Sequence, residues 1–343
     1  MELITTEARL RFTFLEQAGI GGEATVFKAK DLQLNSTIAI KRILKSSFTD
    51  ESKYFLESQK LHEAEHSFVV PIKFGCWDDD HVYLGMPYYV NGSLKDLMDK
   101  RFLTTREVVS YSRQFLSGLN SIHSKGLLHF DIKPENILIN DAGQACVSDF
   151  GLAQYTGGYG FATVAGTTPI FAPPELFVQA QHNLKFDVYQ SGLAMYRMCN
   201  GDKIFQEQAN NAFISRGIIA DVNFIKNLNR GKFPDRGNYL PHMPKKLRLL
   251  INKAMNPDPN KRYSTVIDML NDLNQLDVND WQYSIDGDTE KWEKLDYVVT
   301  CSLAKGYYVM TAIKNGRRKR DFCRKISLAD KNSVTYNCLN TRW

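Results

Sequence analysis

Long apolar runs are missing from this chain of 343 residues. No stretch of about 18 apolar residues occurs, which is the length that a membrane-spanning helix needs. Residues 1–7 carry neither the basic start nor the apolar centre of a secretory signal. We therefore expect a protein that has no transmembrane helix or signal peptide and that works in the cytoplasm.

Clustered cysteines are also missing. The chain has six, at positions 76, 146, 199, 301, 323 and 338, with no CxxC pair and no companion histidine cluster. This scatter disfavours both a structural metal site and a disulfide framework. Reduced thiols, as expected in a cytoplasm, are the simplest interpretation.

An excess of positive charge is absent from most of the chain. Between Trp281 and Trp343 there are 12 Lys+Arg and 7 Asp+Glu, a net charge of +5. The whole chain also carries +5, so residues 1–280 are neutral on balance. The composition therefore separates a charge-balanced body from a basic C-terminal segment.

Two short motifs carry the strongest chemical signal. Residues 129–136 read HFDIKPEN, and residues 149–151 read DFG. Asn136 and Asp149 supply the hard oxygen atoms that Mg²⁺ takes beside substrate phosphates. Asp131 can accept or orient the proton of an attacking hydroxyl, and Lys133 can neutralise charge on the group being transferred.

At these residues the sequence resembles the eukaryotic-type serine/threonine protein kinase family, because both signatures stand in order at the usual separation. The resemblance implies an α+β, bilobal fold whose ligands are ATP and Mg²⁺. It implies a kinase domain over residues 1–276, with a β-rich small lobe over about 1–90 and a helical large lobe over about 91–276. Asp131 and Lys133 are then the catalytic residues, and Asn136 and Asp149 the metal ligands.

The resemblance also assigns a nucleotide site. Its residues are Gly19, Ile20, Gly21, Gly22, Val26, Ala39, Lys41, Glu57, Met86, Tyr88, Tyr89 and Leu138. Glycines in the first part let the backbone approach phosphates, although the third glycine of the family pattern is Ala24 here. Lys41 would contact phosphates from a strand and pair with Glu57, for which Glu63 and Glu65 are competitors. Pro87 lacks an N–H, so adenine contacts would fall on the two tyrosines that follow it.

Further matches concern the large lobe. Thr168 and Lys133 match the serine/threonine-specific members. Glu175 should be buried and paired with Arg262, because a buried carboxylate without a partner is costly. Asp187 matches the helix carboxylate that holds the catalytic loop.

Phe130 departs from the family pattern, which has an arginine there in most regulated members. Phenylalanine cannot pair with a phosphate group. We therefore expect that phosphorylation of Thr156, Thr163 or Thr167 is not an on-switch acting through this residue.

The basic segment, residues 281–343, reads as a separate β-rich module. Strands are predicted over 295–302, 307–314 and 317–326, with a hairpin turn at Asn315-Gly316 and a short helix after Ser327. The basic run at 317–320 is most simply a solvated face. Docking on an acidic protein or on the kinase lobe, and contact with a nucleic acid, stay open.

A serine/threonine protein kinase is the favoured function. A pseudokinase scaffold is disfavoured because every catalytic residue type is present, and a small-molecule kinase because the segment ending at Glu175 resembles that of protein kinases. A nucleic-acid-binding regulator would require the basic module to bind alone. We expect that removing residues 281–343 leaves a folded kinase; insolubility would instead make this module part of the core.

Overall fold

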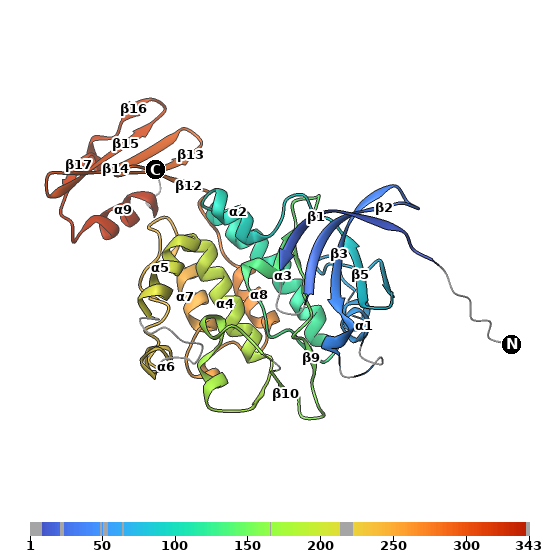
Figure 1. Ribbon diagram of the computed structural model, residues 1–343. Coiled ribbons are helices and arrows are strands. Elements are labelled where there is room, and N and C mark those ends of the chain that lie inside the picture. Colours follow the sequence, from blue (N-terminus) through green and yellow to red (C-terminus); the bar gives the residue numbers. More distant parts are fainter. Residues whose placement is uncertain are drawn as a thin grey trace. The chain divides into compact units, whose positions relative to one another are not determined.

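The computed structural model describes residues 9–20, 24–48, 50, 54–63, 65–164, 166–212 and 222–340. The chain divides into two compact units, Met1–Val90 and Asn91–Trp343 (Figure 1). Within the described residues, no helix has both the length and the apolar character that crossing a bilayer requires.

The first unit is built on a five-stranded antiparallel sheet in the order β1-β2-β3-β5-β4 (Figure 1). Its strands are β1 (Phe12–Ile20), β2 (Ala24–Asp31), β3 (Ser36–Leu44), β4 (Phe74–Trp77) and β5 (His81–Pro87), and its helix is α1 (Leu56–Glu63). The position of Lys41 in a strand, β3, agrees with the expectation from the sequence. The β-rich small lobe corresponds to this unit.

Alternation along β3 separates two faces of this sheet. Ile38 and Ile40 are buried beside Ala29 and Tyr83 on one face. Ile43 packs with Val82 and Leu84 on the other. Because successive side chains in a strand point to opposite faces, the nucleotide-site candidates in β3 share the face of Ile43.

The second unit contains most of the helices. They are α2 (Leu94–Lys100), α3 (Thr105–Ser124), α4 (Lys185–Asn200), α5 (Asp202–Ala212), α6 (Val222–Asn229), α7 (Lys245–Ala254), α8 (Val266–Asn274) and α9 (Lys331–Asn340). A capping box begins α3: the Thr104 side chain accepts from the Glu107 N–H, and the Glu107 side chain accepts from the Thr104 N–H. It satisfies N–H groups that the first helical turn leaves without partners.

Short strands flank the loops between α3 and α4 in this unit. They are β6 (Leu127–Leu128), β7 (Ile137–Ile139), β8 (Ala145–Val147), β9 (Gln154–Tyr155), β10 (Ala162–Thr163) and β11 (Gln181–His182). They pair as β6–β9, β7–β8 and β10–β11. The β6–β9 and β10–β11 pairs join the segment after Asp149 to the body of the unit.

The C-terminal module is a larger sheet than the sequence predicted. Its strands are β12 (Gln282–Asp286), β13 (Thr289–Lys294), β14 (Tyr297–Ala304), β15 (Tyr307–Lys314), β16 (Arg317–Arg318) and β17 (Arg324–Ile326). The order is β12-β13-β14-β15-β16, and β17 also pairs with β15. The prediction of three strands was wrong: two strands precede β14, and the third predicted strand is split by a 3-10 turn, Arg320–Phe322. The helix predicted after Ser327 is present as α9.

The module packs against helices and loops of the same unit. The Trp292 Nε1–H donates to His242 Nδ1 at 3.2 Å, and the Tyr283 ring lies edge-on to Phe102, with centroids 4.6 Å apart. From α9, Tyr336 lies under the guanidinium of Arg248. Trp292, Tyr283 and His242 are all buried. Residues 281–340 therefore share an apolar interface with the helical part of the unit.

Candidate active site

The loop between β6 and β7 is held from α4 through its backbone. Asp187 accepts hydrogen bonds from the N–H groups of His129 and Phe130, each at 2.8 Å. Gln190 donates to the Phe130 carbonyl and accepts from the Ile132 N–H, both at 3.0 Å. These bonds fix the backbone at Phe130, whose φ of 65° lies in the left-handed region that non-glycine residues rarely adopt.

Asp187 itself is fully buried at the N-terminal turn of α4. Burial alone would raise the pKa of its carboxyl group. The hydrogen bond from His123, together with the electrostatic effect of His123 and His129, lowers that pKa overall. The His123 Nε2 lies 2.7 Å from Asp187 Oδ2. The carboxylate thus stays charged while it orients two consecutive N–H groups, as predicted for this position.

Asp131 lies at the centre of the loop, and its two carboxylate oxygens differ. Lys133 Nζ and Asn136 Nδ2 both donate to Oδ2, each at 2.7 Å. The other oxygen, Oδ1, is buried and accepts from no group in the described part of the chain. Buried acceptors normally have a hydrogen-bond partner. The Oδ1 atom of Asp131 is therefore available to accept a hydrogen bond from a bound molecule.

Asn136 connects this loop to the segment that holds Asp149. The Asn136 carbonyl accepts from both the N–H and the hydroxyl of Ser148, at 2.9 and 3.0 Å. Asn136 uses its Nδ2 on Asp131, which leaves its Oδ1 as a further oxygen acceptor. Asp149 follows Ser148 with φ 61° and accepts weakly from the Gly151 N–H at 3.4 Å.

The donor set of these two residues fits Mg²⁺. An amide oxygen and a carboxylate are hard ligands, and Mg²⁺ commonly takes one or two protein groups beside substrate phosphates. The neighbouring Phe150 is fully buried, and its ring lies edge-on to His129 with centroids 5.1 Å apart. This packing holds the residue that follows Asp149.

The nucleotide-site candidates of the first unit share one sheet face. Val26 lies opposite Lys41, and Ala39 lies opposite Met86. Directly opposed residues, and residues two apart, project from the same side, so these four side chains line the face of Ile43. Gly19 lies opposite Val26 at the end of β1.

Other candidates are placed only in part. Gly21 and Gly22 lie outside the described residues, as do the side chains of Ile20 and Glu57. The predicted pair of Lys41 with Glu57 therefore stays a prediction. Tyr88 and Tyr89 follow β5, and the Lys28 ammonium lies 5.1 Å from the Tyr88 ring centroid. Leu138, in the second unit, lies in β7 and forms a bridge with Ser93.

One structural pair is confirmed in full. Arg262 donates to both carboxylate oxygens of Glu175 at 2.6 Å, and both residues are buried. This bidentate geometry is the strong form of an arginine–carboxylate contact. This ion pair attaches the C-terminal end of the segment that begins at Asp149 to the residues just before α8.

Two residues of α4 were missed by the sequence reasoning. Gln190 holds the backbone on both sides of Asp131, and Arg197 binds Glu135 within the HFDIKPEN motif. A signal for Arg197 was present. It is a charged residue flanked by Tyr196 and Met198, and a buried charge must be paired. No comparable pattern marked Gln190.

Comparisons with known proteins agree with this geometry. A probable serine/threonine-protein kinase of Clostridium perfringens is 28% identical over 276 residues, which is 78% of this chain and 38% of the relative. The kinase ULK3 of Homo sapiens is 27% identical over 261 residues, covering 74% and 52% of the two chains. PrkC of Bacillus subtilis is 26% identical over 334 residues, covering 90% and 49%.

The chain thus spans about half the length, or less, of these relatives. The model of the protein kinase domain matches residues 12–274, which include every candidate site residue described above. That match covers well over half of the 343 residues, and the chain therefore belongs to the protein kinase domain family.

Proposed function

We propose that this chain is a serine/threonine protein kinase that transfers the γ-phosphoryl group of ATP to a hydroxyl of a protein. The observation that carries the proposal is the asymmetry of Asp131. One oxygen is fixed by Lys133 and Asn136, and the other is buried without a donor. That second oxygen can accept or orient the proton of an acceptor hydroxyl, which is the role of the base in phosphoryl transfer.

The ligands in this proposal are ATP and Mg²⁺. Asn136 and Asp149 would hold the cation, which would neutralise charge on the phosphates. Lys133 lies 2.7 Å from Asp131 and can stabilise negative charge on the transferring group. In the first unit, Lys41 would bind phosphate oxygens, while Val26, Ala39 and Met86 offer apolar surface on the same sheet face.

The proposal is tested by transfer of label from γ-³²P-ATP to a generic basic protein. Asp149→Ala should abolish transfer and the Mg²⁺-dependent rise in melting temperature that ATP produces. Asp141→Asn is the matched control, because Asp141 is exposed in the turn between β7 and β8. Unchanged ATP binding in Asp149→Ala would refute the metal role. Absence of transfer by a wild-type chain that ATP stabilises would favour a scaffold.

We also propose that the segment after Asp149 is held in place without a phosphate. The support is an apolar cluster in which Phe130, Leu128, Ala162 and Phe186 are buried together. The Phe130 and Phe186 rings pack edge-on with centroids 5.1 Å apart. A phosphate-binding arginine would need a polar environment there, whereas phenylalanine joins the segment to the body by burial of apolar surface.

A partner for the C-terminal module is a further proposal. Six basic residues between Arg317 and Lys325 are exposed. None forms an ion pair within the described residues, and the Lys325 ammonium lies 4.7 Å from the Tyr307 ring centroid. They are Arg317, Arg318, Lys319, Arg320, Arg324 and Lys325. We propose that this edge binds an acidic protein surface, since unpaired like charges favour a polyanion. Fluorescent poly-glutamate should bind with strong salt dependence, and replacing residues 317–320 by serine should remove the binding. Tighter binding of a random DNA oligonucleotide would instead indicate a nucleic acid.

A cytoplasmic location completes the proposal. All six cysteines are free thiols, and four of them are buried. Burial raises the pKa of Cys146 to about 11 and that of Cys338 to about 12. Such thiols suit a reducing compartment. Fractionation of cells that express the full chain would test the assignment, and recovery with the membrane fraction would contradict it.

A further inference from the structure

Arg197 lies in a setting where a free charge is not tolerated. It belongs to α4, in which all residues from Phe186 to Asn200 are buried, and its side chain is 0% exposed. Burial alone would lower the pKa of the guanidinium, but Glu135 and Asp202 raise it overall. The side chain is therefore a cation that two carboxylates neutralise.

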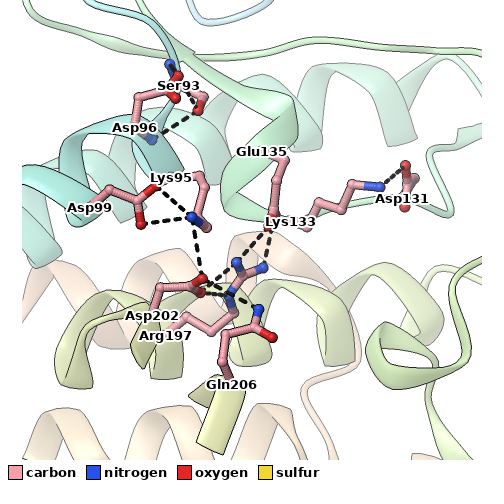
Figure 2. Close-up of polar contacts among 10 residues, drawn as sticks. All are labelled: Ser93, Lys95, Asp96, Asp99, Asp131, Lys133, Glu135, Arg197, Asp202 and Gln206. Atoms are coloured by element: carbon pink, nitrogen blue, oxygen red, sulfur yellow. Dashed lines mark hydrogen bonds and ion pairs between the residues drawn. The ribbon is translucent and has the colours of Figure 1, made fainter. Parts of the chain in front are cut away.

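The two carboxylates lie on different sides of the guanidinium (Figure 2). Toward the catalytic loop, Nη1 and Nη2 donate to the two oxygens of Glu135 at 2.8 and 2.6 Å. Toward α5, Nε donates to Asp202 Oδ1 at 2.7 Å, and Nη2 lies 2.6 Å from the same oxygen. Lys95 and Gln206 also contact Asp202, so that carboxylate has further donors of its own.

Glu135 connects Arg197 to the part of the loop that contains Asp131. It lies between Lys133 and Asn136 in the chain, and both of those residues donate to Asp131 Oδ2. The Glu135 side chain is 33% exposed, so arginine rather than apolar packing determines where it lies. A two-point arginine–carboxylate contact fixes direction as well as distance.

A second contact links the same residues. The ring of Phe171 lies 5.1 Å from the Arg197 guanidinium and 5.8 Å from Lys133 Nζ. The Phe205 ring lies 5.2 Å from Arg197 and stacks on Phe171 with centroids 5.9 Å apart. Arg197 therefore touches two groups, Glu135 and Phe171, that in turn adjoin the lysine beside Asp131.

We propose that Arg197 is a positioning residue for phosphoryl transfer: it holds Glu135 and thereby sets Lys133 and Asn136 on Asp131. The proposal rests on the role proposed above for Asp131. Positioning by a rigid helix is effective because a displacement of about 1 Å in a catalytic group can cost about 100-fold in rate. Asp202 binds the same guanidinium but does not contact the loop. A variant of Asp202 therefore shows the effect of lost stability without the effect of lost positioning.

The experiment compares Arg197→Met, Arg197→Lys and Asp202→Asn in the full chain. For each variant, kcat, the KM for ATP and the melting temperature are measured, with Asp131→Asn alongside. Arg197→Met should lower kcat at least tenfold while the KM for ATP changes less than threefold. Arg197→Lys should recover only part of kcat, because lysine lacks the planar fork. Asp202→Asn should lower the melting temperature but keep kcat within about threefold of wild type.

The outcomes separate the two levels of the argument. A normal kcat in Arg197→Met would overturn the positioning role. So would a loss of kcat that is in the same proportion to the fall in melting temperature in Arg197→Met and in Asp202→Asn. Should Arg197→Met fail to fold, Glu135→Gln replaces it, since Arg197 keeps Asp202 there; a reduced kcat supports the proposal, and an unchanged one overturns it. Normal turnover in Asp131→Asn would instead remove the proposed function on which the inference rests.

Discussion

At the scale of single residues, Asp131 provides the sharpest test. Asparagine at this position keeps the shape and an oxygen for Lys133, but it cannot accept a proton. Asp131→Asn should therefore lower kcat by about 10²- to 10⁴-fold, the usual contribution of a general base. The rise in melting temperature caused by ATP and Mg²⁺ should persist, because Asn136 and Asp149 are unchanged. Turnover within threefold of wild type would exclude Asp131 as the base.

Residue-level prediction from sequence succeeded where a motif fixes the partner. The pair of Glu175 and Arg262 was predicted and is present as a two-point ion pair. Gln190 and Arg197 were not predicted, because their partners in the catalytic loop are 58 to 62 residues away and no local pattern connects them. Hydrogen bonds from a helix side chain to a distant backbone emerge only when the fold brings the two together.

At the scale of elements, the segment between Asp149 and Glu175 is joined to the body by backbone pairing and apolar contact. β9 pairs with β6, β10 pairs with β11, and Phe130 packs with Ala162 and Phe186. None of these contacts needs a phosphate. Replacing Thr156, Thr163 and Thr167 together by alanine should therefore leave kcat within a few-fold of wild type.

The control for that prediction is Phe130→Ala. Loss of a buried phenylalanine typically costs about 3–5 kcal/mol, and the segment should lose its support, so melting temperature and activity should both fall. Activity is measured by label transfer after phosphatase treatment of each variant. A triple-alanine chain that is inactive, and that regains activity with glutamate at one of the three positions, would show that a phosphate acts there.

Prediction of elements depended on how much apolar surface each strand buries. β15 was predicted over residues 307–314, as observed, because apolar residues dominate it. β13 was missed, since Trp292 is its only buried residue and the others are polar or charged. The predicted strand over 317–326 is interrupted because the Lys319 N–H bonds back to the Ala312 carbonyl and a 3-10 turn follows.

At the scale of the whole molecule, His242 makes the interface with the C-terminal module sensitive to acid. Burial, and then the charge of Arg248, lower the pKa of His242 to about 3. The unfolded chain binds the proton near pH 6.5, so the contribution of this residue to stability is full above that pH and falls as the pH decreases. The slope is about 1.4 kcal/mol per pH unit between the two values.

The expected result is a loss of about 2 kcal/mol in the free energy of unfolding between pH 6.5 and pH 5 that His242→Gln does not show. Glutamine keeps an acceptor for the Trp292 Nε1–H. Burial also lowers the pKa of His182, which acts in the same sense but is present in both chains and cancels. Urea unfolding at several pH values measures the difference, and equal pH dependence in both chains would contradict the assignment.

Removal of residues 281–343 tests whether the module is independent of the kinase domain. The sequence alone suggested that it is, but Trp292 and Tyr283 are buried against His242 and Phe102. Each buried aromatic side chain contributes roughly 1.5–3 kcal/mol, and its partner surface would become exposed. We therefore expect the shortened chain to melt at least several degrees lower and to aggregate.

Serine at residues 317–320 of the full chain, which changes charge on an exposed edge, should leave the melting temperature unchanged. A shortened chain that is monomeric and melts with the full chain would show that the interface contributes nothing to the stability of the helical part.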